Sequence, residues 1–564
     1  MRKQNGLVLK NLLEFEYFPS ELPPCFSTSS LALKCKNIEN FDDASMNKMT
    51  SLPIKFSSYK SRNNRRILSI PHPYYYLKMV KALVDNQTDL FKIFEKSNSS
   101  LTKPLNKKCE ANLSVPYMKT AMVFNDTKNH IEKIYAGNKY EIKLDINNFF
   151  GSIYTHTISW VLHGKKNAKK NSQDSTLLGN ILDKCCTSVN DRQTSGILVG
   201  NAASRIISEI ILCFIDEKLE KQFEKKQIVY RRYVDDYYIF VKEASQIEYV
   251  ISEIRILLQE YELNLNDNKV QIIEAPFVET KKWIINLKKS MIFNINDLYD
   301  TIILEYINNN RDIKVLRYGL KLLDCRIIEK HEWEKIESKI YNLMVNCPEI
   351  LPDLLNIFIY NKDYLNKKEL KRSLYEIINF GLKIKKDLEV VWAIYYIKLL
   401  EIKPSHKIIK NILDSDNVLA IIIASDLYKE HLMPSKLIEN IKSAIYFSNS
   451  SPEQKNEILF SKWWIVAYEL RIHKFFNSAN EAITYPDHNP FFKLLKKHNI
   501  SFYDTDCSKV LESKKEKNSS NSISDLRKII KEIASNTSNF DNDANQYLLN
   551  KLSDVVDLVV KNEY

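Results

Sequence analysis

The chain has 564 residues, of which 44% are hydrophobic, and a formal net charge of +12 at pH 7. Its length exceeds the size at which a single hydrophobic core stops growing, so two or more domains are expected. The positive charge suits an anionic partner but is weak evidence for nucleic acid by itself. The nine cysteines are odd in number and show no C-x-x-C spacing, so neither a disulfide framework nor a zinc site is indicated.

Membrane insertion is not expected from the hydropathy pattern. The most apolar stretches, 390–397 and 418–424, are far shorter than the roughly 18 residues that cross a bilayer. Residues 1–18 lack the long apolar core and the small-residue cleavage site of a signal peptide. We therefore expect a cytoplasmic location.

Glycine is distributed unevenly along the chain. Of nine glycines, only Gly319 and Gly381 lie beyond residue 200. Sheets need glycine at their turns, whereas helices joined by polar loops need little. This predicts an α+β part over residues 1–288, an all-helical part over 289–512, and a polar linker with C-terminal helices over 513–564.

A strand is predicted within "KYEIKLDINNFF" (139–150). Its residues alternate between two faces. One face is apolar and consists of Tyr140, Ile142, Leu144 and Ile146. The other face is polar and ends at Asp145, so the strand carries this carboxylate away from its core.

The next elements are a loop, "SGILVG" (195–200), and a helix over 201–219. The helix repeats apolar residues at helical spacing. It opens with small residues from Ala202 to Ser204, which allow another group to approach closely.

Two adjacent carboxylates, Asp235 and Asp236, interrupt the aromatic run "YRRYVDDYYIF" (230–240). The flanks favour strands, and the Asp pair fits the tip of a tight hairpin. An exposed turn would explain the pair equally well. In a buried setting, however, adjacent like charges need a cation.

From about 290 to 510 the pattern is helical. Residues 388–415 and 417–447 each contain an apolar helix, a Pro-Ser pair and an amphipathic helix. Pro404 and Pro434 are 30 residues apart (434 − 404), which favours a degenerate helix-pair repeat of the HEAT-like kind. A plain irregular helical domain explains the pattern equally well.

The carboxylates of the predicted strand and hairpin suit two-metal nucleotidyl transfer if these elements are neighbours. One divalent ion would lower the pKa of an attacking hydroxyl, and the other would hold the triphosphate. The cations would also supply the positive charge that compensates the two adjacent aspartates.

These motifs resemble the fingers and palm of reverse transcriptases, which are right-hand polymerases. "YVDD" and "KLDINNFF" match the two aspartate motifs, and "GILVGNAAS" has the spacing of the third motif, which contains Gly200. The resemblance implies two Mg²⁺ ions, replaceable by Mn²⁺, bound by Asp145, the Ile146 carbonyl, Asp235 and Asp236. It implies catalysis by the three aspartates on deoxynucleoside triphosphates and nucleic acid.

The resemblance also implies roles around the nucleotide. Phe150 sits where an aromatic residue excludes a ribose 2′-hydroxyl. Arg66, in "RRILSIPHP", matches the arginine that grips the incoming triphosphate. Lys269, in "LNLNDNKVQI", matches the lysine that protonates pyrophosphate, and Gly200 is placed among the nucleotide-binding residues.

A narrower resemblance is to abortive-infection reverse transcriptases of the AbiK and AbiA type, in the unknown-group, defence-associated class. It is carried by residues 17–26, 149–165 and 491–504. It implies a helical-repeat domain in place of a thumb, antiphage defence in a bacterial cytoplasm, oligomer formation, and DNA synthesis without a conventional template. Some members prime from a tyrosine hydroxyl, for which Tyr17 is a candidate here, although a packed aromatic is also consistent with its setting.

Two features separate this chain from ordinary relatives. Where reverse transcriptases have Pro-Gln-Gly, it has Leu198-Val199-Gly200, which favours untemplated or restricted synthesis. No maturase, endonuclease or zinc module is recognisable.

Alternative functions remain at this point. One is a retron- or group II intron-like enzyme that copies a cognate RNA, and another is an inactive helical-repeat scaffold. Arg326 and His331 fit the R-x4-H spacing of HEPN ribonucleases, but a helix surface explains them better.

Overall fold

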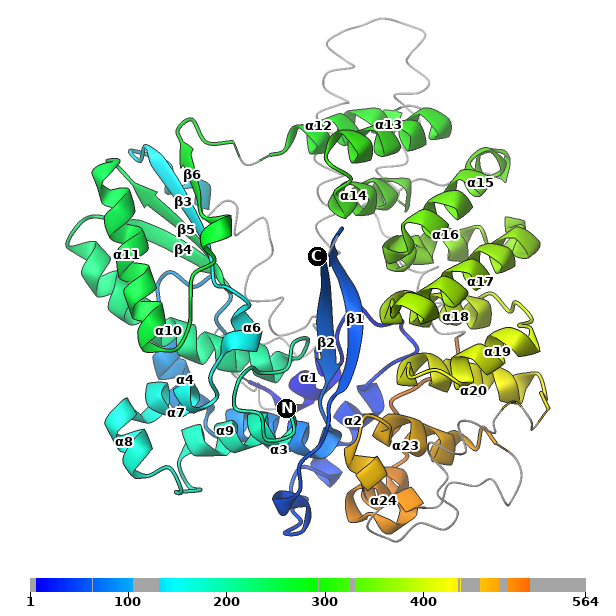
Figure 1. The fold of residues 1–564 in the computed structure, drawn as a ribbon, viewed down its shortest axis with the longest axis horizontal. Coiled ribbons are helices and arrows are strands. Elements are labelled where there is room, and N and C mark those ends of the chain that lie inside the picture. Colours follow the sequence, from blue (N-terminus) through cyan, green and yellow to red (C-terminus); the bar gives the residue numbers. More distant parts are fainter. Residues whose placement is uncertain are drawn as a thin grey trace, which may run out of the picture.

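The computed structural model describes residues 7–62, 64–104, 131–278, 280–292, 294–324, 328, 330–434, 437, 457–476 and 485–507. Three sequence predictions concern positions outside these residues. They are Arg326 of the R-x4-H pair, the segment directly after Pro434, and the segment 513–564. A small sheet with its helices and a curved stack of helices form the two sides of the molecule, and a two-stranded hairpin stands between them (Figure 1).

The N-terminal half alternates short helices with two sheets. Its helices are α1 (Leu9–Glu14), α2 (Ser29–Leu33), α3 (Pro73–Asp85), α4 (Gln87–Phe94), α6 (Phe149–Ser152), α7 (His156–His163), α8 (Lys165–Lys170), α9 (Leu178–Ser188), α10 (Ala202–Glu224) and α11 (Ser245–Glu260). Its strands are β1 (Ile54–Ser61), β2 (Asn64–Ile70), β3 (Tyr140–Asp145), β4 (Val229–Tyr233), β5 (Asp236–Val241) and β6 (Gln271–Glu274).

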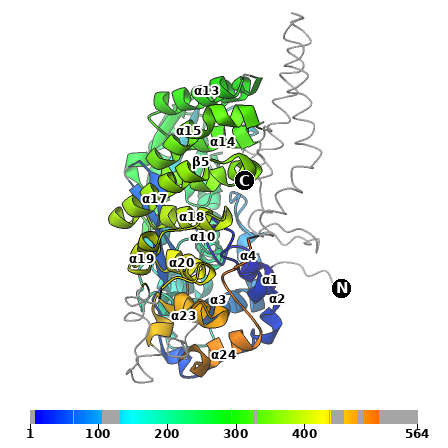
Figure 2. The same ribbon diagram turned by 90° about the vertical axis from the view of Figure 1, so that its right-hand side faces the viewer.

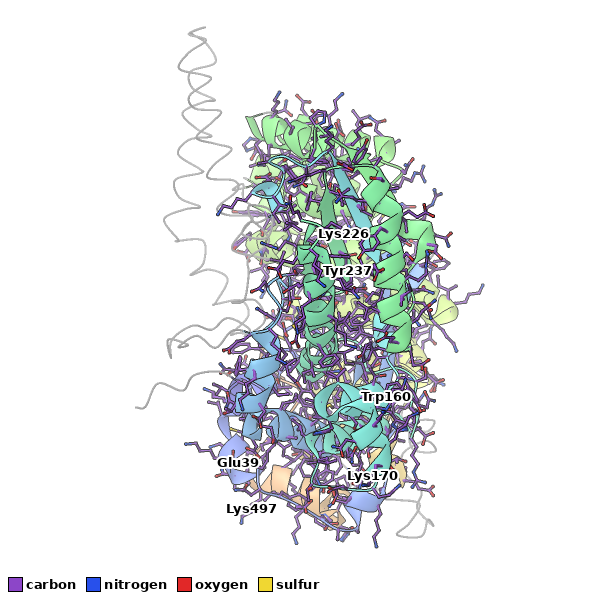
Figure 3. All side chains as sticks on the ribbon, turned by 90° about the vertical axis from the view of Figure 1, so that its left-hand side faces the viewer. Glu39, Trp160, Lys170, Lys226, Tyr237 and Lys497 are labelled. Atoms are coloured by element: carbon purple, nitrogen blue, oxygen red, sulfur yellow. The ribbon has the colours of Figure 1, made fainter. Side chains whose placement is uncertain are left out.

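The four-stranded sheet has the order β4-β5-β3-β6, and its pairs are antiparallel. Helices α10 and α11 lie on its far side from the helical stack, and Figure 3 places Tyr237 of β5 among the packed side chains there. The predicted strand and helix are confirmed, with Asn201 capping α10 by accepting a hydrogen bond from the Ser204 amide. The sheet and the helices α10 and α11 position the end of β3 and the tip of the β4–β5 hairpin.

The predicted alternation of β3 holds on its apolar face but not entirely on the other. Ile142 and Leu144 are buried as expected, yet Glu141 is only 1% exposed. Its cross-strand neighbour Phe240 is packed against Tyr135 and Phe277. This aromatic cover, which comes from outside the strand, buries the face that alternation alone assigns to solvent.

The helical array follows the sheet. Its helices are α12 (Lys282–Lys289), α13 (Ile295–Asn308), α14 (Ile313–Asp324), α15 (Lys330–Asn346), α16 (Leu355–Tyr360), α17 (Lys367–Ile384), α18 (Asp387–Leu399), α19 (His406–Leu413), α20 (Val418–Glu430), α23 (Trp464–His473) and α24 (Pro490–Lys497). Helix α12 packs on α13 and α14.

Helices of the array stack as pairs. Helix α17 packs on α18 and α19 on α20, while α17 also contacts α19 and α18 contacts α20. Side chains link equivalent positions of successive pairs: Asn417 donates to the Asp387 carbonyl, and Lys398 binds Glu430. Each pair thus covers the apolar face of the next.

The chain returns to its beginning at the end of the array. Figure 2 shows α24 at the lower end of the molecule, close to α1 and α2. Asn37 and His498 lie within 3.3 Å, and Figure 3 shows Glu39 near Lys497 at this end. Sequence order suggests domains with separate cores, but the last described segment shares its core with the first.

Aromatic rings make up much of this shared core. His72, which follows β2, stacks on Phe460 with ring centres 5.0 Å apart and also contacts Trp464 and Phe492. The apolar face of α23 includes Trp464, and that of α24 includes Phe491 and Phe492. Short helices of this kind are stable only when their apolar face is covered. The N-terminal aromatics provide that cover.

Among the described residues, none of the helices is both long and apolar enough to cross a bilayer.

Candidate active site

The carboxylates singled out in the sequence meet at one end of the four-stranded sheet. Asp145 is the last residue of β3 and is the register partner of Asp236, the first residue of β5. Asp235 lies in the two-residue turn with Val234, and its carbonyl accepts a hydrogen bond from the Ile146 amide at 3.3 Å. The structure therefore brings together three carboxylates that the sequence separates into two motifs.

These carboxylates influence one another although their exposure differs: Asp145 is buried, Asp235 half-buried and Asp236 exposed. Burial, followed by the charges of Asp236 and Asp145, raises the pKa of Asp235 to about 6. Burial and Asp145 also raise the pKa of Asp236, while Lys269 and Lys314 act in the opposite direction. Like charges held this close favour protonation or a bound cation. The site is thus poised to accept positive charge.

Lys269 supplies positive charge in this arrangement. Its ammonium lies 2.7 Å from Asp145 Oδ2, and the side-chain amide of Asn266 donates to the same oxygen at 3.1 Å. The hydrogen bond to Asp145 raises the pKa of Lys269 above its usual range, so the group is protonated at neutral pH. Both residues come from the segment that follows α11. The backbone amide of Asn266 also donates to the Asp145 carbonyl.

A buried ion network holds the hairpin tip in place. The Arg232 side chain is fully buried and lies 2.7 Å from Asp216 and 3.1 Å from Glu209, both on α10. It also donates to the Val234 carbonyl at 2.8 Å. The Val234 amide donates to Thr102 Oγ1, which itself donates to Glu209. Both backbone groups of Val234 are therefore tied to the α10 network.

The turn is strained as well as anchored. Val234 has φ of 54°, a left-handed conformation that a β-branched residue adopts only at a cost. The surrounding hydrogen bonds overcome that cost and keep Asp235 and Asp236 aimed past the end of β3.

The donor set fits divalent cations of the Mg²⁺ type, since carboxylate and carbonyl oxygens are their preferred ligands. The crowding of Asp145, Asp235 and Asp236 is the feature that a cation would relieve. As arranged, no three His, Cys, Asp or Glu side chains in the described part of the chain stand close enough to hold an ion. Asp145 binds Lys269 instead, so a cation would have to compete with that ammonium.

Arg66 lies on β2 of the β1–β2 hairpin. Arg66 is exposed and shares a strand face with Leu68, because residues two apart lie on the same face. A Cβ on Gly200 would lie 3.5 Å from Leu68, and the Ser69 amide donates to the Val199 carbonyl. Arg66 thus lies on the hairpin face that contacts the third-motif loop.

Gly200 is required by its backbone. Its φ is +106°, and a Cβ there would meet Pro19 Cγ at 2.8 Å. Both observations exclude other residues without rearrangement. Its position supports a packing role at the hairpin base beside the nucleotide role expected from the sequence.

Phe150 lies in α6, immediately after the Asp145 strand. It is half-buried, its ring centre is 5.2 Å from that of Phe149, and its carbonyl accepts from the Ile197 amide at 2.8 Å. The loop with Leu198 and Val199 therefore packs directly beside Phe150, and Leu198 is buried. Its role at the sugar stays a prediction.

Tyr17 is placed differently from a priming residue. Its side chain is buried, stacks on Tyr76 at 4.2 Å and donates to the Pro71 carbonyl at 2.9 Å. Burial raises its pKa well above the usual range, which opposes deprotonation. The packed-aromatic interpretation of Tyr17 fits this structure, and a priming role would require the side chain to leave its place in the core.

Sequence reasoning missed Asn266, Arg232 and Lys314. Asn266 lies three residues before Lys269, so its motif was visible although its bond to Asp145 was not. In the sequence, Arg232 is indistinguishable from other polar residues of a strand. Lys314 belongs to α14 of the array, and no local pattern places it near Asp236.

Residues 43–316 match the reverse transcriptase (RNA-dependent DNA polymerase) family. A stretch of 158 residues is 26% identical to the retron Ec83 reverse transcriptase of Escherichia coli, covering 27% of this chain and 49% of that protein. The chain thus matches about half the length of this relative. All residues of the candidate site lie within the family match except Tyr17.

Similar solved structures include telomerases. Apo telomerase from Candida tropicalis matches with a TM-score of 0.31 and 12% identity over 67% of this chain and 70% of that one. Telomerase from Candida albicans in complex with a fragment of telomeric RNA matches with a TM-score of 0.28 and 11% identity, over 60% and 65%. Such scores are too low to define a common architecture. The family match and the three converging carboxylates lie in the same part of the chain, residues 43–316.

Proposed function

We propose that this protein is a reverse-transcriptase-type DNA polymerase that joins deoxynucleotides by two-metal nucleotidyl transfer. The observation that carries the proposal is the in-register pairing of Asp145 with Asp236 beside Asp235. The geometry and the family match point to the same chemistry.

Each residue has a defined part in this proposal. Asp145, Asp235, Asp236 and the Ile146 carbonyl would hold Mg²⁺ or Mn²⁺, which when bound activates a hydroxyl and neutralises phosphate charge. Arg66 binds the triphosphate, and Phe150 excludes the 2′-hydroxyl. Lys269, protonated at neutral pH, can release Asp145 and donate a proton to the departing pyrophosphate.

The biological role that we propose is antiphage defence by abortive infection, with untemplated or otherwise non-conventional synthesis. The motif stretches shared with AbiK- and AbiA-type enzymes and the Leu198-Val199-Gly200 loop support it. We further propose that the array is a HEAT-like repeat, that the protein forms homo-oligomers, and that it acts in the cytoplasm. The stacked helix pairs support the repeat assignment.

Incorporation of labelled deoxynucleotides in Mg²⁺ or Mn²⁺ tests the catalytic proposal. Asp235→Asn keeps the size of the side chain and removes its charge, so incorporation should fall by about 100-fold or more. Asp267→Asn is the matched control, because Asp267 is 71% exposed and binds Arg255 instead. Full activity of folded Asp235→Asn protein would refute the assigned site, whereas absence of incorporation by the wild-type protein would favour the scaffold alternative.

Protein priming is tested by the fate of the label. After denaturation, label that stays with the polypeptide and is released only by nuclease or protease indicates a covalent link. A tyrosine other than Tyr17 is then expected, because Tyr17 is buried. Label that runs entirely as free nucleic acid, with or without protease, requires an external primer.

A retron-like enzyme that copies a cognate RNA is the second candidate. The observation that favours it is the 26% identity to the retron reverse transcriptase. Sequencing of copurified nucleic acid separates the two: one defined RNA with its complementary DNA supports this candidate, and DNA of simple or random sequence supports the first.

A further inference from the structure

A cavity of about 870 Å³ separates the tip of the β1–β2 hairpin from the helical array. The hairpin contributes Tyr59 and Arg62, and the array contributes Tyr306, Arg311 and Glu349. Arg65, which faces the array, lines it as well. Tyr59 and Arg65 are register partners and share one strand face, whereas Arg66 lies on the other. The cavity is therefore on the opposite side of the hairpin from the residue expected to bind the incoming triphosphate.

Positive charge gathers at the exposed edge of this cavity. Arg65 is neutralised by Glu389 at 2.6 Å, and Lys339 is neutralised by Asp300 at 3.0 Å. Arg62 and Arg311 are exposed, and within the described residues neither guanidinium has an ion pair or hydrogen bond. Two free guanidinium groups on facing elements are suited to bind phosphate oxygens.

The inner part of the cavity has a different chemistry. The Glu349 side chain is 11% exposed, and its Oε2 accepts no hydrogen bond, with the Lys386 ammonium 3.9 Å away. Burial raises the pKa of Glu349 above its ordinary value. A buried carboxylate oxygen without a donor is costly, so a ligand that brings N–H donors would be stabilised here.

Aromatic rings lie beside this carboxylate. Tyr59 and Tyr306 are half-buried, and Tyr306 is hydrogen-bonded to Cys347 at 3.5 Å. Flat π faces at this position can stack with a nucleobase. The cavity thus offers an aromatic lining, one acceptor at its inner end and cations at its mouth.

We propose that this cavity binds a free guanine nucleotide, with the phosphates on Arg62 and Arg311, the base between Tyr59 and Tyr306, and the N1–H and 2-amino donors of guanine on Glu349. Guanine presents two adjacent donors that match a carboxylate, whereas adenine presents one. The volume suits a small ligand, since such sites measure roughly 300–1,000 Å³. Because both hairpin and array form the site, an occupant would hold the two together.

Equilibrium binding of GTP, ATP and inorganic triphosphate to the full-length protein tests the proposal. The measurements use EDTA and the Asp235→Asn variant, so that metal-dependent binding at the polymerase site is suppressed. GTP should bind most tightly, and Arg62→Ala and Arg311→Ala should each weaken GTP binding by about tenfold. Glu349→Ala should remove about tenfold of the preference for GTP over ATP.

The control is Lys407→Ala, which removes one positive charge from an exposed position on α19 and should leave GTP binding unchanged. Loss of binding on Arg66→Ala, with no effect of Arg311→Ala, would place the nucleotide at the polymerase site and overturn the proposal. Equal affinity for GTP and ATP would overturn the guanine assignment. Binding of single-stranded DNA through Arg62 and Arg311, without GTP binding, would make the cavity a strand path instead.

Discussion

The two hairpins that carry the candidate site are held in opposite ways. The β4–β5 hairpin, with Asp235 and Asp236, is anchored by the fully buried Arg232 and its partners on α10. The β1–β2 hairpin, with Arg66, is held at its outer half by polar contacts to the array. Arg65, 26% exposed, binds Glu389, and Ser57 donates to Asp387 at 2.8 Å.

This difference makes the β4–β5 hairpin rigid, whereas the β1–β2 hairpin can detach from the array. Breaking a buried charge network leaves uncompensated charges in a medium of low dielectric constant and is expensive. Breaking the Arg65–Glu389 pair costs less, because water reaches the freed guanidinium, although Glu389 itself is only 3% exposed. The hairpin with Asp235 and Asp236 is therefore preorganised, whereas the hairpin with Arg66 can separate from the array at moderate cost.

Removal of the buried anchor should have the largest effect. Arg232→Met leaves Glu209 and Asp216 buried without their cation, so the free energy of unfolding should fall by about 3–5 kcal/mol. Urea denaturation followed by circular dichroism measures this. Arg231→Met is the control, because the Arg231 side chain donates only to the adjacent Tyr230 carbonyl among described contacts. A loss below about 1 kcal/mol in Arg232→Met would show that the network does not anchor the hairpin.

Acid should weaken the base of the other hairpin through His72. Burial lowers the pKa of His72 to about 3, below its unfolded value near 6.5. The unfolded chain therefore binds a proton that the folded chain excludes, and stability is lost as pH falls from 6.5 toward 3. At pH 5 this loss should reach about 2 kcal/mol.

The measurement is the free energy of unfolding between pH 7.5 and 5 for wild type and His72→Phe. Phenylalanine keeps the ring stack but loses the bonds to the Tyr74 amide and the Leu459 carbonyl. The variant should be less stable at pH 7.5 and should lose part of the acid dependence. Parallel pH curves for the two proteins would show that His72 titrates alike in the folded and unfolded states.

Loss of the contact between the β1–β2 hairpin and the array should have the smallest effect. A double-mutant cycle of Arg65→Met and Glu389→Gln should give a coupling free energy of about 1 kcal/mol. Hydrogen exchange should accelerate in residues 54–70 of Arg65→Met and stay unchanged in residues 229–241. Equal acceleration in both hairpins would mean that they open together, and the contrast between them would be invalid.

The candidate site was largely predictable because its signals are local. Adjacent aspartates within an aromatic run, an alternating strand that ends in Asp145, and a small-residue helix start each occupy a few consecutive positions. The contacts that complete the site were not predictable in this way. The in-register position of Asp145 opposite Asp236, and the Lys269 ammonium on Asp145, depend on which strands pair and in what register.

Side-chain periodicity and turn chemistry reveal the order of the motifs, the aspartate hairpin and the change from mixed α/β structure to helices without the folded chain. Tertiary structure alone decided that the last aromatic helices complete the core of the first segment, and that Arg65 meets Glu389 across 324 positions of the chain. Such contacts join segments through the packing of complementary faces. Neither partner carries a local pattern that names the other, so only the folded chain reveals them.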